Sequence, residues 1–155
     1  MRRAQLFLAA TLLLMSAPAR AQSLKERQDM ERGQRSLDAA VAFINKKCGS
    51  SMKATVDVTS FLGKIDARHS FASPFAWCEN VVNAFNAICE SADGKRSTQA
   101  KVVHVQCRYD ASATKEKLKR HRPVLSLSGR VLGAGYNLTT ANLTVETRKF
   151  LEKNL

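Results

Sequence analysis

The sequence predicts an α+β fold of two layers, in which helices pack on an antiparallel sheet of three or four strands and two disulfides add cross-links. Two sequence patterns and the number of cysteines predict this fold. Apolar residues recur at helical spacing between Phe75 and Ser91, and polar and apolar residues alternate between Lys101 and Tyr109. The four cysteines are an even set, which in a small exported domain is typical of two disulfides.

The first residues indicate export. Arg2 and Arg3 precede an apolar run from Leu6 to Met15, and the small-residue site Ala19-Arg20-Ala21 follows it. This is the pattern of a secretory signal peptide over residues 1–21. The run is shorter than the about 20 residues that a membrane-spanning helix needs. We therefore expect residues 22–155 to be a single α+β domain without a transmembrane segment, periplasmic or secreted.

The mature chain is predicted to begin with a charged helix. Ser23 and Glu26 have the spacing of a capping box, and Gly49 is a suitable stop. Charged residues crowd its first half, and an apolar stripe is present only from Leu37 to Cys48. We expect the helix to dock by its second half and to project its charged start into water.

A short strand follows, because polarity alternates from Lys53 to Val58. Residues 59–65 fit either a helical turn or more strand. Residues 66–73 have the composition of a loop.

The central part of the chain is predicted as one helix and one strand. The helix runs from Phe75 to Ser91, with Ser73 as a plausible cap. Asp93-Gly94 is a turn-prone pair. The strand from Lys101 to Tyr109 then returns antiparallel along the helix.

The next two strands are predicted to form a hairpin. They span Pro123 to Leu127 and Arg130 to Leu138, on either side of the turn-prone pair Ser128-Gly129. Gly133 and Gly135 in the second strand indicate a bulge or a close approach of a helix.

The last predicted element is a helix from Thr139 or Thr140 to Leu155, with one apolar stripe toward the sheet. The order is therefore helix, strand, helix, three strands and helix. Such an order is typical of helices that cover one face of an antiparallel sheet.

The helix geometry restricts how the cysteines pair. Cys78 and Cys89 lie eleven residues apart on one predicted helix, roughly 16 Å along its axis, too far for a disulfide. An antiparallel strand brings Cys107 near the helix start, which favours Cys78–Cys107 and Cys48–Cys89. The pairing Cys89–Cys107 with Cys48–Cys78 stays open. The spacings do not match a metal site, so no metal is predicted.

A strong positive charge suggests an anionic partner. Cleavage after residue 21 leaves 22 Lys and Arg against 13 Asp and Glu, a formal charge of +9. The most basic stretch is Asp110 to Arg122, next to the outward side of the strand with Val102, His104, Gln106 and Arg108. It lacks aromatic residues for stacking on bases, so no specific nucleic-acid site is predicted. The predicted anion-binding residues are Lys115, Lys117, Lys119, Arg120, Arg122, His104 and Arg108.

These features predict a non-enzymatic, disulfide-stabilised binding module without a cofactor, for an anionic polymer, an envelope surface or an acidic protein. We find no catalytic or dinucleotide-binding motif. One alternative is a metal-independent, ribonuclease-like hydrolase that uses His69, His104, His121 and Lys101. Another is a structural subunit of an envelope complex, with the first helix as its contact.

Overall fold

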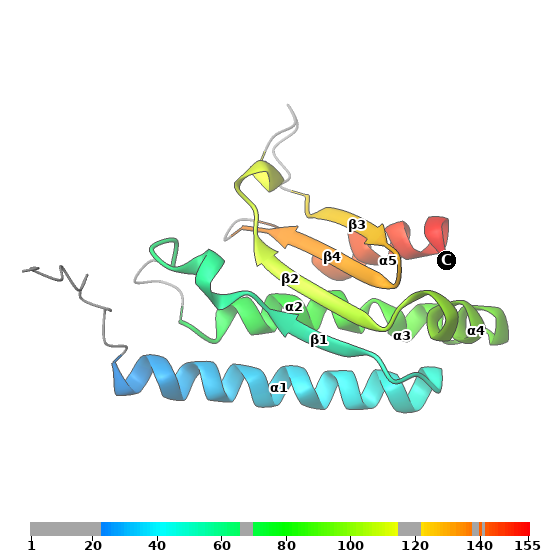
Figure 1. Cartoon of the computed structure of the whole chain (residues 1–155), viewed down its shortest axis with the longest axis horizontal. Helices are drawn as coiled ribbons and strands as arrows, with labels where there is room; N and C mark the ends of the chain where they lie inside the picture. The colour runs from blue at the N-terminus through cyan, green and yellow to red at the C-terminus, as the bar shows by residue number, and fades with distance from the viewer. Residues whose placement is uncertain (1–22, 66–69, 115–121, 138–139, 141) are drawn as a thin grey trace, which may run out of the picture.

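A computed structural model describes residues 23–65, 70–114, 122–137, 140 and 142–155, and the predicted signal peptide lies outside them. The fold is α+β, as predicted, and Figure 1 shows the arrangement of its helices and sheet. The elements are α1 (Leu24–Cys48), β1 (Lys53–Val56), the 3₁₀ turn η1 (Val58–Phe61), α2 (Ser73–Asn83), α3 (Phe85–Ile88), α4 (Ala92–Lys101), β2 (His104–Tyr109), the 3₁₀ turn η2 (Ala111–Thr114), β3 (Val124–Ser128), β4 (Val131–Tyr136) and α5 (Leu143–Asn154).

The described strands form one mixed sheet in the order β1-β2-β4-β3. β1 pairs with β2 and β2 with β4 in parallel, whereas β3 and β4 are antiparallel. The prediction of an antiparallel sheet is therefore wrong. Three helices connect β1 to β2, and such a crossover returns the chain to the end where β1 began. β3 lies at the edge of the sheet. β4 then returns between β3 and β2, in the same direction as β2 (Figure 1).

The predicted turn at Asp93-Gly94 is also wrong, because both residues belong to α4. Ser91 caps this helix, and its hydroxyl accepts a hydrogen bond from the amide of Gly94 at 2.9 Å. A Cβ at position 94 would lie 1.9 Å from the carbonyl oxygen of Ile88. The glycine is therefore explained by the close approach of α3. Since α4 ends at Lys101, the strand starts three residues later than predicted.

The predicted central helix is divided into α2 and α3 at Ala84, whose amide donates to the carbonyls of both Val81 and Val82. The predicted apolar face is correct: Val81 and Phe85 are fully buried. Ser73 is the first residue of α2 and makes no side-chain cap.

α1 forms with the predicted capping box and ends at Gly49 in the left-handed conformation. Its first half, however, docks more than predicted, because Asp29 and Gly33 are buried. A Cβ on Gly33 would lie 2.7 to 2.9 Å from atoms of Phe75, so α1 and α2 approach closely there. Figure 1 shows the two helices side by side.

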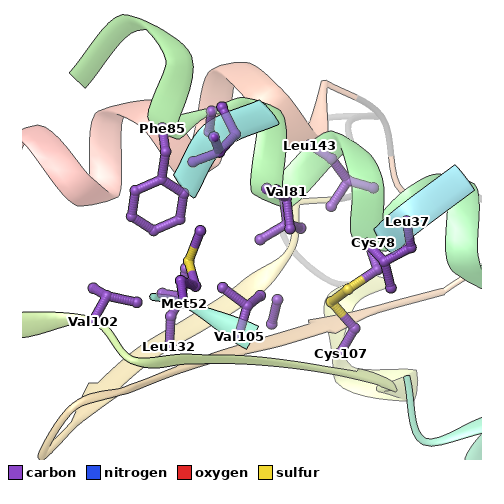
Figure 2. Close-up of a cluster of buried hydrophobic side chains, with 14 of the residues drawn as sticks. Leu37, Met52, Cys78, Val81, Phe85, Val102, Val105, Cys107, Leu132 and Leu143 are labelled. Atoms are coloured by element: carbon purple, nitrogen blue, oxygen red, sulfur yellow. A yellow bond between two sulfur atoms is a disulfide. The ribbon is translucent and has the colours of Figure 1, made fainter. Parts of the chain in front are cut away.

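The buried side chains gather between the helices and one face of the sheet (Figure 2). Along β2, Val105 and Cys107 are fully buried, whereas Gln106 and Arg108 are exposed. Tyr136 of β4 is buried, and its hydroxyl donates to the carbonyl oxygen of Pro74 at 2.7 Å. Burial raises the pKa of this tyrosine far above its usual value.

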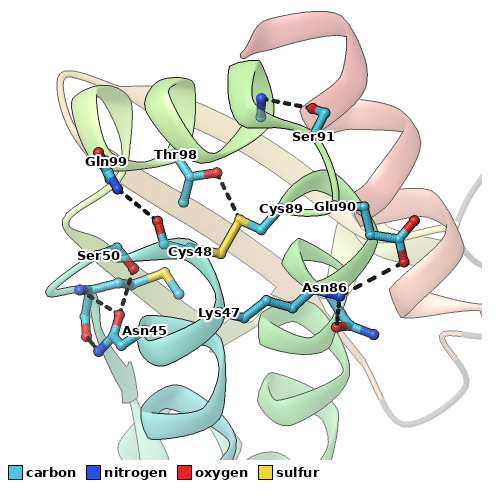
Figure 3. Close-up of a disulfide and its surroundings, with 12 residues drawn as sticks. Asn45, Lys47, Cys48, Ser50, Asn86, Cys89, Glu90, Ser91, Thr98 and Gln99 are labelled. Atoms are coloured by element: carbon cyan, nitrogen blue, oxygen red, sulfur yellow. Dashed lines mark hydrogen bonds and ion pairs between the residues drawn. A yellow bond between two sulfur atoms is a disulfide. The ribbon is translucent and has the colours of Figure 1, made fainter.

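Both disulfides have the pairing that the sequence favoured. Cys78–Cys107 joins α2 to β2 within the core (Figure 2), and Cys48–Cys89 joins the end of α1 to the end of α3 (Figure 3). All four cysteines are fully buried. Each bridge therefore links segments that are distant in sequence.

The hairpin turns at Gly129-Arg130, and β3 pairs with β4 in an unbroken register without a bulge. The final helix starts later than predicted, at Leu143. Its cap is Asn142, in the left-handed conformation. Thr139, one of the predicted caps, lies outside the described residues.

Candidate functional site

The four strands present their polar side chains on one side of the sheet, which we call the outer face. Residues alternate between the two sides of a strand, so the exposed Gln106 and Arg108 define this side. The register places their neighbours in rows across the sheet. The outer face comprises Lys53, Thr55, His104, Gln106, Arg108, Val131, Gly133, Gly135, Val124, Ser126 and Ser128.

A hollow of about 170 Å³ lies on the outer face. β4 contributes two glycines to its lining, and β2 and β3 contribute amide, guanidinium and hydroxyl groups. It is lined by Gln106, Arg108, Val124, Ser126, Ser128, Val131, Gly133 and Gly135. These polar groups supply donors and acceptors for a polar ligand.

His104 is half-buried at one end of the outer face. Its Nε2 lies 2.8 Å from Oγ1 of Thr55 on β1, and Lys53 is its register partner. Lys53 is exposed. This end of the face therefore combines an imidazole, a hydroxyl and an ammonium group.

Arg108 lies at the other end, between Asp110 and Asp57. Its Nη2 is 4.0 Å from Oδ2 of Asp110. On its other side is Asp57, whose amide donates to the carbonyl of Cys107 at 2.8 Å and so extends the ladder between β1 and β2. Arg108 thus has an acidic residue as its neighbour on each side, and the Asp110 carboxylate is 4.0 Å from its guanidinium.

The pKa of the Asp57 carboxyl is held below its usual value, chiefly because the Thr59 hydroxyl donates to it at 2.5 Å. Partial desolvation acts in the opposite direction. The amides of Ser60 and Thr59 and, last, the positive charge of Arg108 lower the pKa further. Asp57 is therefore a negative neighbour of Arg108 at neutral pH.

Asp110 is held in a fixed position. Its Oδ1 accepts hydrogen bonds from the amide of Ser112 at 2.9 Å and from the Ser112 hydroxyl at 2.6 Å. Asp57 and Asp110 are each followed by a 3₁₀ turn, so the two parallel strands end alike. Both aspartates follow the carboxyl ends of their strands, and these ends lie side by side because β1 and β2 run in parallel.

The other predicted residues are distributed elsewhere. Arg122 is exposed, with Nε 3.9 Å from Oε2 of Glu146 on α5. Val102, predicted to lie on the outer face, is buried, and it is the C-cap of α4 and not part of the strand. Four predicted cationic residues lie outside the described residues: Lys115, Lys117, Lys119 and Arg120.

Of the residues considered for hydrolysis, Lys101 interacts with the end of the chain. Its ammonium donates to the backbone oxygens of Asn154 at 3.2 Å and Leu155 at 2.6 Å. His69 and His121 lie outside the described residues. Hence the described residues bring no second histidine to His104.

A larger hollow, of about 350 Å³, lies between α1 and β1 and includes Asp38, Val41 and Met52 in its lining. It contains none of the predicted binding residues. Asn45, also in its wall, is occupied with the α1–β1 connection: its side chain donates to Met52 O and accepts from Met52 N and Ser50 Oγ. We assign no function to this hollow.

Within the described residues, no group of three or more His, Cys, Asp or Glu is placed to hold a metal ion. Among the helices of this part of the chain, none combines the length and apolarity needed to cross a membrane.

Comparisons with protein-family models, with curated proteins and with solved structures found no match.

Sequence reasoning missed Asp57, Asp110 and the two glycines as parts of the face. A signal was present: each Asp follows an alternating segment and precedes Thr or Ser within two residues, a pattern typical of a capped turn. The pattern locates the turns. Asp110 is near Arg108 because it follows two residues later, whereas only the parallel pairing of β1 with β2 brings Asp57 beside Arg108.

Proposed function

We propose that this protein is an exported, non-enzymatic binding module that holds an anionic partner, an envelope component or an acidic protein, on the outer face of its sheet. One observation carries the proposal: in the described residues, the face opposite the buried core presents polar and cationic side chains around a hollow. A soluble domain that leaves such a face uncovered has a surface available for a ligand.

The net charge supports an anionic partner. The chain after residue 21 carries a formal charge of +9, and the basic segment 110–122 directly follows β2 in sequence. Lys53 and Arg108 add cations on the face itself. Positive surfaces accelerate encounter with anionic partners and raise their local concentration.

We also infer that the helices form a single layer on the buried face, which leaves the other face open. The alternation of buried and exposed residues along β2 supports this inference. Such alternation is typical of a sheet that is covered on one side only.

We place the protein in the periplasm or outside the cell. The predicted signal peptide and the two disulfides support an oxidising compartment. Amino-terminal sequencing of protein from its native host is expected to begin at Gln22. A mature chain that begins at Met1 would contradict this placement.

The test measures binding of the oxidised mature chain to two anionic probes: vesicles of phosphatidylcholine with added phosphatidylglycerol, and poly-glutamate. Affinity is expected to fall as salt rises, because screening weakens exposed charge interactions. Replacing Lys117, Lys119 and Arg120 by alanine together is expected to raise the Kd for the vesicles about a hundred-fold, since each cation near such a surface contributes about 1 kcal/mol.

The matched control replaces Lys25, Arg27 and Arg35 of α1, three exposed cations, by alanine. It removes the same charge from another part of the molecule. Equal losses in the two triple variants would show a non-specific charge effect. Binding that is absent, or that responds to neither salt nor the first triple variant, would refute the proposal.

A further inference from the structure

Three residues form a row across the outer face where the parallel strands end. Asp57 adjoins Arg108 across the β1–β2 ladder, and Gly135 is the register partner of Arg108 on β4. Gly135 has no side chain, and the carboxylate of Asp110 occupies the space above it. The Asp110 carboxylate therefore lies on one side of Arg108, and Asp57 is its neighbour on the other.

The position above Gly135 is tightly filled. A Cβ there would lie 2.7 Å from Cβ of Asp110 and 2.8 Å from its Oδ2. That Oδ2 is the atom 4.0 Å from the Arg108 guanidinium. Ser112 holds the other oxygen, Oδ1, through two hydrogen bonds. The carboxylate is thus fixed by Ser112 and directed at Arg108 over a glycine.

The two partners differ in exposure. The Asp110 side chain is 18% exposed, whereas that of Arg108 is 64% exposed. The arginine is therefore accessible to a ligand, and the aspartate is a fixed part of the fold.

We propose that Asp110 limits anion binding at Arg108. Its carboxylate competes with external anions for the guanidinium, and an anionic group binds Arg108 only by displacing this carboxylate. Asp57 adds repulsion from the other side. The inference rests on the proposed function, because it concerns the affinity of the same face. It predicts selectivity for anionic groups that bring further contacts in the hollow, such as hydrogen bonds to Gln106 or Ser126, over simple anions.

The test measures the binding of inorganic phosphate at Arg108. The Nε–Hε signal of Arg108 is monitored by nuclear magnetic resonance during phosphate titration of the wild type and of Asp110→Asn. The amide keeps an oxygen that can accept from Ser112 but removes the charge. The apparent phosphate affinity is expected to rise about two- to five-fold, the range for loss of an exposed ion pair.

Two further variants test whether phosphate affinity depends on how Asp110 is held and on the location of the removed charge. Ser112→Ala removes the hydroxyl that fixes Asp110, so a smaller gain is expected. Asp38→Asn removes an exposed carboxylate from α1 as a charge-matched control, and no change at Arg108 is expected. Urea unfolding of each variant shows whether the fold is intact. If Asp110→Asn does not fold, the phosphate titration of Ser112→Ala tests the proposal in its place.

Equal phosphate affinity in the wild type, Asp110→Asn and Ser112→Ala would overturn the proposal, and so would an equal gain in Asp38→Asn. The proposed function fails separately, if vesicles and poly-glutamate do not bind. The phosphate titration remains informative in that case, because it reads Arg108 without either probe.

Discussion

The disulfides allow the most quantitative prediction. Cys78–Cys107 closes a loop of 29 residues and Cys48–Cys89 one of 41. Loop-closure entropy of the unfolded chain gives about 3.6 kcal/mol of stability for the first bridge and about 3.9 kcal/mol for the second. The loops overlap in sequence, so removal of both bridges is expected to cost less than the sum. Small domains have only about 5 to 15 kcal/mol in total.

The perturbation is paired replacement by alanine, Cys78→Ala with Cys107→Ala and, separately, Cys48→Ala with Cys89→Ala. Alanine introduces no polar group at these fully buried positions. Each pair is expected to lower the free energy of unfolding by about 3 to 4 kcal/mol and Tm by roughly 10 to 20 °C.

The assay is urea unfolding followed by circular dichroism. The m-value is expected to rise in both variants, because an unfolded chain without the bridge exposes more surface. A loss below about 1 kcal/mol with an unchanged m-value would refute the view that the bridges act by constraining the unfolded chain.

Three further outcomes are expected. Asp57 has a folded-state pKa below the ordinary 3.8, so its contribution to stability is present above that pH and is lost as the pH falls through the folded value; urea midpoints of Asp57→Asn are expected to vary less with acid pH than those of the wild type. Gly135→Ala is expected to lower the free energy of unfolding by about 1 to 3 kcal/mol, because the new Cβ would clash with Asp110. Gly133→Ala is expected to lower it less, since the close neighbour of a Cβ there is the Ser126 hydroxyl oxygen, which can rotate away. Equal urea midpoints of the two variants would contradict this. If the hydrolase alternative holds, RNA incubated with the wild type is cleaved and RNA incubated with His104→Ala is not, as read on a denaturing gel.

Local patterns predicted the helices best. α1 forms with its capping box and glycine stop because those signals act within a few residues of each other. The buried stripe with Val81 and Phe85 follows directly from helical spacing. The disulfide pairing also followed from distance along one helix, although that helix is broken at Ala84.

Strand direction was not predictable in this way. Asp93-Gly94 has turn chemistry, yet Ser91 supplies a helix cap and α4 forms there instead. A turn there would reverse the chain relative to the preceding helix, but it would not change the direction of β2 relative to β1. Two strands of one sheet that a helical crossover joins run parallel, as β1 and β2 do. Gly94 allows α4 to approach α3 closely, since a Cβ there would lie 1.9 Å from the carbonyl oxygen of Ile88.

The sequence by itself determined the cysteine count, the positive charge, the helical faces and the alternation that separates His104 and Arg108 from the core, since each depends on composition or on spacing within one element. Only the tertiary structure decided that β1, β2 and β4 run in parallel, and therefore that Asp57 is the neighbour of Arg108 on one side and Gly135, with Asp110 over it, the neighbour on the other. The physical reason is that the neighbours of a strand depend on how the chain returns to the sheet, and that path is selected by contacts between residues distant in sequence.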